Sequence, residues 1–127
     1  MGHMPYDQFT TILQISRLHI YLTYPFVLSW SLLETMAVGG AILASDTAPV
    51  RELITQDETG RLTDFFDAEA LVKEACALLE DDAARARLGA AARAHMVAGY
   101  DLKKTCLPRQ LDWVQALYEA APLALPD

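Results

Sequence analysis

The chain has 127 residues, of which 53% are hydrophobic and 21% charged, and this balance is typical of one folded domain rather than of a disordered segment. Its formal net charge of -7 repels the phosphate backbone of nucleic acids, which excludes a general nucleic-acid binder. An acidic total still permits a site for one phosphorylated small molecule, because backbone N–H groups at a helix start attract anions.

Targeting and cysteine patterns indicate the compartment. No uninterrupted apolar run approaches the roughly 18 to 20 residues needed to cross a bilayer. Residues 1–4 have neither the basic residues nor the apolar stretch of a signal peptide, and we interpret them as an expression scar. Cys76 and Cys106 lack the C-x-x-C spacing of redox and metal sites. We therefore expect a cytoplasmic protein with two reduced, partly buried thiols.

Helical and strand patterns alternate in the first half of the chain. We predict, in chain order, a helix over 6–17, a strand over 18–24, a helix over 29–38, a strand over 41–44, a short helix over 49–54 and a strand over 60–63. The apolar residues of 18–24 do not alternate cleanly, which indicates burial on both faces and hence a parallel sheet. The glycine pair 39–40 is expected to end the helix before it.

The remainder of the chain is predicted to be helical. Aspartates suited to helix N-caps precede three further helices: Asp67, then Asp81 or Asp82, then Asp101. The middle helix is expected to end at Gly99, and Pro108 either kinks the last helix or marks its true beginning. The whole pattern predicts an α/β fold, with a partial Rossmann-like parallel sheet of about three strands flanked by helices and a helical C-terminal third.

Ligands of open α/β sheets bind at the carboxyl ends of strands, where the next helix begins. Two such junctions occur here, at residues 24–30 and 45–52. Backbone amides at the first junction are suited to hold a phosphate. Glu34, a little further into the same helix, can offer its carboxylate to a sugar hydroxyl.

The run SLLETMAVGGAILASD, from Ser31 to Asp46, resembles the LEAMACGxPVVASD stretch of the large retaining glycosyltransferase family four, which has the GT-B fold. Further segments resemble motifs of the same family in the same order: PVRELI at 49–54, GRL at 60–62, DAEAL at 67–71 and the helix over 87–100. The resemblance covers the chain from Tyr6 to about Trp113.

That family has an E-x₇-E motif, and Glu34 aligns with its second glutamate. The resemblance implies that Glu34 accepts hydrogen bonds from the ribose hydroxyls of a nucleotide sugar, a task suited to a carboxylate. Phe26 holds the position of the first glutamate and cannot hydrogen-bond the donor sugar. The residues between them replace a glycine-rich link, and their backbone amides are expected to face the sugar and diphosphate: Val27, Leu28, Ser29 and Trp30.

The resemblance also implies a domain assignment and an activity. Residues 5–121 are expected to be the second half of a GT-B nucleotide-sugar-binding domain, and 122–127 a loose tail. The parent enzyme is expected to move a hexose from a nucleotide diphosphate sugar to an acceptor with retention, and the missing N-terminal domain leaves this fragment inactive. We expect no cofactor and no metal, because no acidic pair such as D-x-D lies near the site.

A second interpretation is a non-catalytic α/β module that works by association. The family sheet has a strand beside 18–24 that this chain lacks, and an apolar strand at a sheet edge is a template for pairing with another copy. This predicts a homo-oligomer, and the replacement of a glutamate by Phe26 favours it. A flavodoxin-like receiver or nucleotide hydrolase is a weaker alternative, since the chain has no Walker-type loop.

Several other residues are given structural roles. His19 is interpreted as a packed strand residue, and Trp30 and Trp113 as packing residues. The arginines of one helix are expected to form its solvated face: Arg85, Arg87 and Arg93. Arg51 and Glu52 remain open between a ligand contact and an ordinary surface helix.

Overall fold

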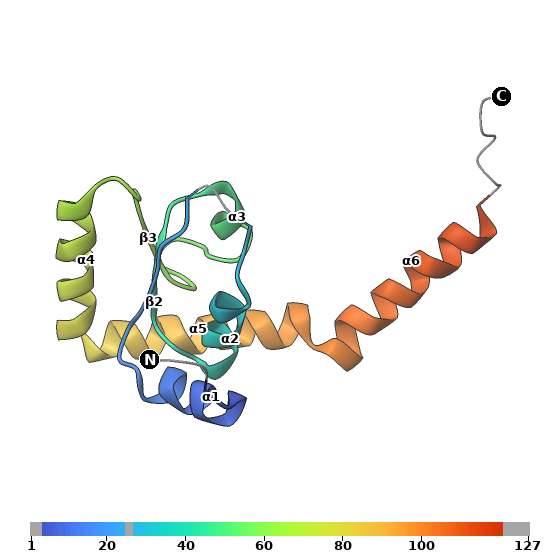
Figure 1. Cartoon of the computed structure of the whole chain (residues 1–127), viewed down its shortest axis with the longest axis horizontal. Coiled ribbons are helices and arrows are strands. Elements are labelled where there is room, and N and C mark those ends of the chain that lie inside the picture. The colour runs from blue at the N-terminus through green and yellow to red at the C-terminus, as the bar shows by residue number, and fades with distance from the viewer. Residues whose placement is uncertain (1–3, 25–26, 121–127) are drawn as a thin grey trace.

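The computed structural model describes residues 4–24 and 27–120. These residues form a parallel sheet flanked by helices, and one helix extends away from this body (Figure 1). The elements are, in chain order, α1 (Tyr6–Ile15), β1 (His19–Tyr21), α2 (Trp30–Val38), β2 (Ile42–Ser45), α3 (Ala48–Arg51), β3 (Arg61–Thr63), α4 (Ala68–Glu80), α5 (Asp82–Tyr100), the π-helix η1 (Leu102–Cys106) and α6 (Leu107–Glu119). The predicted fold class is confirmed. The predicted scar, except Met4, and the predicted tail lie outside the described residues, as does Phe26.

The sheet has three parallel strands in the order β1-β2-β3. All four residues of β2 are buried, as expected for a central strand covered on both faces. β1 is shorter than the predicted strand over 18–24, because the chain leaves the ladder after Tyr21. Beyond Tyr21 the Ser45 hydroxyl takes the place of the backbone hydrogen bonds between the strands. It accepts from the Thr23 N–H at 2.9 Å and donates to the Thr23 carbonyl at 2.8 Å.

Most of the predicted cap residues lie at the ends of helices in the structure. Asp67 and Asp81 cap α4 and α5, each accepting a backbone N–H at 2.8 Å. Gly39 ends α2 in the left-handed conformation, with φ of 81°. The predicted end of α5 at Gly99 is wrong by one residue, because Gly99 does not adopt a positive φ and the helix continues to Tyr100.

The C-terminal segment was predicted to be one helix, kinked or begun at Pro108, but the structure has the π-helix η1 followed by α6. Asp101 does not cap α6; it caps η1, where its Oδ1 accepts from the backbone N–H of Lys103 and Lys104 at 2.9 and 2.8 Å. Pro108 lies in the first turn of α6 and so marks its beginning. α6 points away from the sheet (Figure 1), and its apolar side chains are exposed. Trp113 is one of them, so its interpretation as a packing residue is wrong.

The core lies on both faces of the sheet. One cluster joins β2 to α2, with Leu32, Met36 and Ile42 fully buried. The second is formed by Leu43, Leu78 and Leu88 between β2, α4 and α5. Cys76, predicted to be partly buried, is exposed because α4 turns Leu78 rather than Cys76 toward this cluster.

The predicted solvated face of α5 is confirmed for Arg87 and Arg93, which are exposed, and wrong for Arg85. All three arginines also bind backbone carbonyls of other segments. Arg87 donates to the Asp57 carbonyl at 2.7 Å, and Arg93 donates to the Ala37 carbonyl at the end of α2. Arg85 donates to the Leu78 carbonyl and has a nearly buried side chain.

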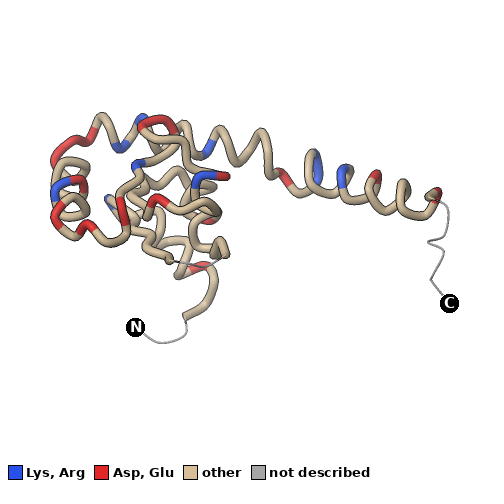
Figure 2. Tube along the Cα trace, turned by 90° about the horizontal axis from the view of Figure 1, so that it is seen from above, with Lys and Arg blue, Asp and Glu red and all other residues tan. Residues whose placement is uncertain are grey.

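Figure 2 shows Lys and Arg dispersed along the chain among acidic residues rather than gathered in one segment. None of the described helices has the length and apolar character needed to span a bilayer.

Candidate functional site

The three parallel strands end at one edge of the sheet, and two of the connections that follow them are hydrogen-bonded to the last residue of a strand. The Asp46 N–H, after β2, donates to the Thr63 carbonyl of β3 at 2.7 Å. The Ser29 N–H, before α2, donates to the Tyr21 hydroxyl at 2.9 Å. These contacts fix the loops at the edge where ligands of such sheets bind.

The predicted phosphate-facing residues lie before and at the start of α2. Val27 is exposed, and Leu28 packs against the core. Ser29 is the N-cap, and its hydroxyl accepts from the Ser31 N–H at 3.3 Å. The Ser29 N–H already has the Tyr21 hydroxyl as its acceptor, so a phosphate would have to replace that hydrogen bond.

Glu34 lies one turn after Trp30, and both side chains line one groove of about 660 Å³. The groove runs along α2 and is bounded by the start of α1 and by the junction of α5, η1 and α6. Trp30 is 81% exposed, so its interpretation as a packing residue is wrong. Tyr6 and Glu34 line the same groove, and hydrogen bonding to Glu34 together with the charge of its carboxylate raises the pKa of the Tyr6 hydroxyl.

A second hollow, of about 280 Å³, lies where all three strands end. It is lined by residues that follow β1, β2 and β3: Tyr24, Asp46, Arg51, Asp64, Phe65 and Phe66. Arg51 binds Asp46 through two contacts, Nε to Oδ1 at 2.5 Å and Nη2 to Oδ2 at 2.6 Å. This hydrogen bonding from Arg51 lowers the pKa of the Asp46 carboxyl, which therefore stays ionised. Glu52, at the end of α3, is exposed.

Sequence reasoning named the junctions at 24–30 and 45–52, which supply Tyr24, Asp46 and Arg51 to this hollow. It missed the loop after β3, although one signal for that loop was present. Two phenylalanines follow β3 after a single residue, Asp64, and they precede the N-cap Asp67 instead of lying inside a strand or helix. Aromatic residues placed in a loop at a strand's carboxyl end are candidates for ligand contact. Their proximity to Tyr24, some forty residues earlier, depends on the parallel sheet order and is not visible in the sequence.

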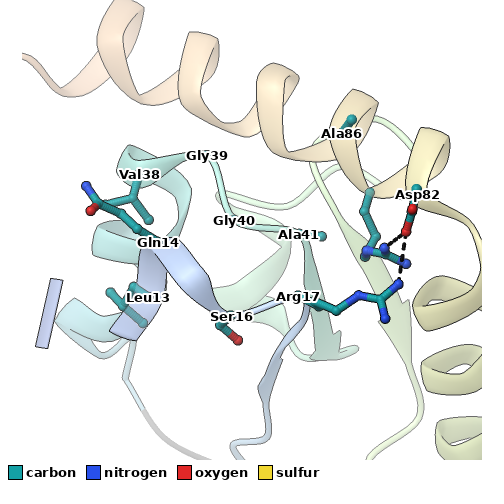
Figure 3. Close-up of a pocket in the computed structure, with 11 residues that line it drawn as sticks. Leu13, Gln14, Ser16, Arg17, Val38, Gly39, Gly40, Ala41, Asp82 and Ala86 are labelled. Carbon is teal, nitrogen blue, oxygen red and sulfur yellow. Dashed lines mark hydrogen bonds and ion pairs between the residues drawn. The ribbon is translucent and has the colours of Figure 1, made fainter. Parts of the chain in front are cut away.

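A third hollow lies at the opposite end of the strands, where Arg17 and Arg85 converge on Asp82 (Figure 3). Arg17 also donates to the Leu79 carbonyl at 3.0 Å, and Arg85 to that of Leu78. These carbonyls belong to the last turn of α4, so the arginines complete a helix end. We assign this cluster to the junction of α4 and α5.

The family model for glycosyl transferases group 1 matches residues 1–95. The chain is 40% identical over 55 residues to a phosphatidyl-myo-inositol mannosyltransferase of Mycolicibacterium smegmatis, a match that covers 43% of this chain and 14% of that protein.

Solved structures share the fold. The sucrose-phosphate synthase of Thermosynechococcus elongatus superimposes with a TM-score of 0.84 over 94% of this chain and 30% of that one, at 21% identity. The Anabaena protein HepE, in complex with UDP-glucose, gives a TM-score of 0.70 over 86% and 29%, at 16% identity. The C-terminal domain of the group 1 protein LpcC from Francisella tularensis gives 0.73 over 81% and 53%, at 16% identity. The chain thus spans about half or less of the length of each of these relatives and solved chains.

Proposed function

The chain belongs to the glycosyl transferases group 1 family, and from this we propose that residues 5–121 are the second half of the nucleotide-sugar-binding domain of a GT-B glycosyltransferase. The parent moves a hexose from a nucleotide diphosphate sugar to an acceptor with retention. The family membership supports the transferase activity, and the UDP-glucose bound to the similarly folded HepE supports this class of donor.

The observation that carries the proposal is the placement of Glu34 in the groove beside α2. A bound ribose would donate two hydroxyls to this carboxylate, which at present has the Tyr6 hydroxyl as its neighbour. The diphosphate would then meet the start of α2, where the helix dipole favours negative charge.

The backbone amides of Val27, Leu28, Ser29 and Trp30 are proposed to face the sugar and diphosphate. This role requires that the exposed side chains of Val27 and Trp30 point away from the bound nucleotide sugar. The isolated chain is proposed to be inactive, because it covers only 30% and 29% of two solved chains that share its fold.

A titration of the isotope-labelled chain with uridine, guanosine and adenosine diphosphates, followed by NMR, tests this site. We expect amide shifts confined to residues 27–34 for at least one nucleotide. Glu34→Gln should weaken binding by about tenfold or more, since it removes a hydrogen-bond acceptor that is charged. Glu69→Gln is the matched control, an exposed glutamate on α4. If none of the three nucleotides at millimolar concentration shifts these amides, the donor site is wrong.

A second candidate function, association through a sheet edge, is favoured by one observation. β1 is an edge strand of the sheet, and Ile20 is 47% exposed on it. An exposed apolar edge favours strand pairing between copies. Light scattering over a range of protein concentrations separates this candidate from a monomeric donor-binding domain.

A further inference from the structure

The hollow where the three strands end is built around three aromatic rings. The Tyr24 and Phe65 rings stack, with centroids 5.7 Å apart and an interplanar angle of 26°. Phe66 meets both of them edge-on, at centroid distances of 5.0 and 5.1 Å. We call this group, with Asp46, Arg51 and Asp64, the aromatic hollow.

The rings are ordered by the fold yet stay exposed. Phe66 is 72% exposed, Tyr24 56% and Phe65 38%, whereas rings of a hydrophobic core are buried. The Asp64 carboxylate accepts from the Phe66 N–H at 2.8 Å and thereby shapes the turn after β3. A platform of exposed aromatic faces on a fixed turn is a feature of binding sites rather than of packing.

The polar groups of the aromatic hollow indicate what it can bind. The doubly bonded pair of Asp46 and Arg51 forms one wall, and Asp64 adds a second carboxylate. Two carboxylates against one guanidinium disfavour a phosphate or another anion. Carboxylate oxygens and a guanidinium held in place accept from, and donate to, the hydroxyl groups of a neutral ligand.

We propose that the aromatic hollow is a subsite for the pyranose ring of a neutral carbohydrate. One face of a pyranose presents C–H groups, which are attracted to the negative face of an aromatic ring, and its rim presents hydroxyls. The C–H face lies on Phe66 or Tyr24, and the rim hydroxyls reach Asp46, Arg51 and Asp64. That the bound sugar is the acceptor of the transfer reaction rests on the proposed function. That the hollow binds a sugar ring does not rest on it.

Saturation-transfer NMR on the whole chain, with methyl α-glucopyranoside, methyl α-mannopyranoside and maltose as probes, tests the subsite. We expect transfer to the sugar C–H protons and shifts of the Tyr24, Phe65 and Phe66 ring signals. Phe66→Leu keeps the apolar volume but removes the aromatic face, and should weaken binding about three- to tenfold. Asp46→Asn should weaken it as well. Trp113→Leu, an equally exposed aromatic on α6, is the control that leaves binding unchanged.

The outcomes decide the proposal independently of the donor site. It is overturned if none of the three sugars shifts the ring signals, if Phe66→Leu binds as well as the unaltered chain, or if a nucleoside diphosphate shifts these rings instead. Failure here together with nucleotide shifts at residues 27–34 rules out the sugar subsite and leaves the donor proposal standing. Sugar binding without nucleotide binding supports the subsite and contradicts the donor site.

Discussion

At the scale of single residues, two glycines decide how closely α5 approaches α2. A Cβ placed on Gly89 would lie 2.1 Å from the Gly39 carbonyl oxygen and 2.9 Å from its carbon. Backbone atoms cannot rotate away as a long side chain can, so the contact demands glycine. The neighbouring Gly39, with its positive φ, ends α2 at the same place.

Gly89→Ala should therefore destabilise the chain by roughly 3 kcal/mol, the upper end of ordinary overpacking costs. Gly99→Ala is the matched control on the same helix, because a Cβ there meets nothing within 4 Å among the described residues. It should stabilise by about 0.5–1 kcal/mol through helix propensity. Urea unfolding of both variants measures the difference, and equal midpoints would contradict the close approach.

His19 is expected to make the stability of the chain depend on pH. Burial lowers the pKa of this histidine, and its Nε2 finds no hydrogen-bond partner in the described part of the chain. The unfolded chain takes up the proton near pH 6.5, before the folded chain does, so stability should fall as the pH drops below that value. The slope for one proton is at most about 1.4 kcal/mol per pH unit. His19→Asn should flatten the curve of unfolding free energy against pH between 7 and 5; an unchanged curve would assign the effect elsewhere.

At the scale of elements, the junction of α5 and α6 shows how one residue redirects a helix. Asp101 has an extended conformation, and its carboxylate satisfies two N–H groups of η1. The backbone carbonyl of Asp101 also accepts from the N–H groups of Thr105 and Cys106, both at 2.9 Å. The change of direction at Asp101 and η1 therefore separates α5, which packs against the body, from α6, whose apolar side chains are exposed.

Asp101→Ala removes this cap and should cost about 1 kcal/mol locally. We expect faster amide hydrogen exchange over residues 102–119 and unchanged exchange in the sheet, because α6 contributes no buried residue to the core. Asp112→Ala, an exposed aspartate within α6, serves as the control. Loss of protection throughout the sheet in Asp101→Ala would show that α6 is coupled to the body.

At the scale of the whole molecule, the proposed association depends on the edge of the sheet that β1 forms. Ile20 lies on β1 at this edge, and Leu22 follows it with 45% exposure. Ile20→Lys places a charge there, a device that natural proteins use to block edge pairing.

If the chain associates through β1, light scattering should show oligomers whose fraction grows with concentration, and Ile20→Lys should return them to monomers. Val72→Lys, on the exposed side of α4, should leave the oligomers intact. A monomer at every concentration would remove the association module from consideration.

The caps, the glycine end of α2 and the alternation of strands with helices could be predicted from the sequence, because each depends on residues within a few positions of one another. Family membership is also a property of the sequence, since motifs such as that from Ser31 to Asp46 keep their order and spacing along the chain. Glu34 could be named as a candidate for the same reason, but its neighbour Tyr6 could not.

Only the tertiary structure decided what depends on residues distant in sequence. The carbonyls that the arginines of α5 bind could not be foreseen, because Ala37, Asp57 and Leu78 lie in other segments of the chain. Trp30 was assigned to the core because its apolar ring says nothing about which face of α2 is covered. The aromatic hollow exists because parallel pairing brings the ends of β1, β2 and β3 to one edge, and no local pattern specifies which strands are neighbours.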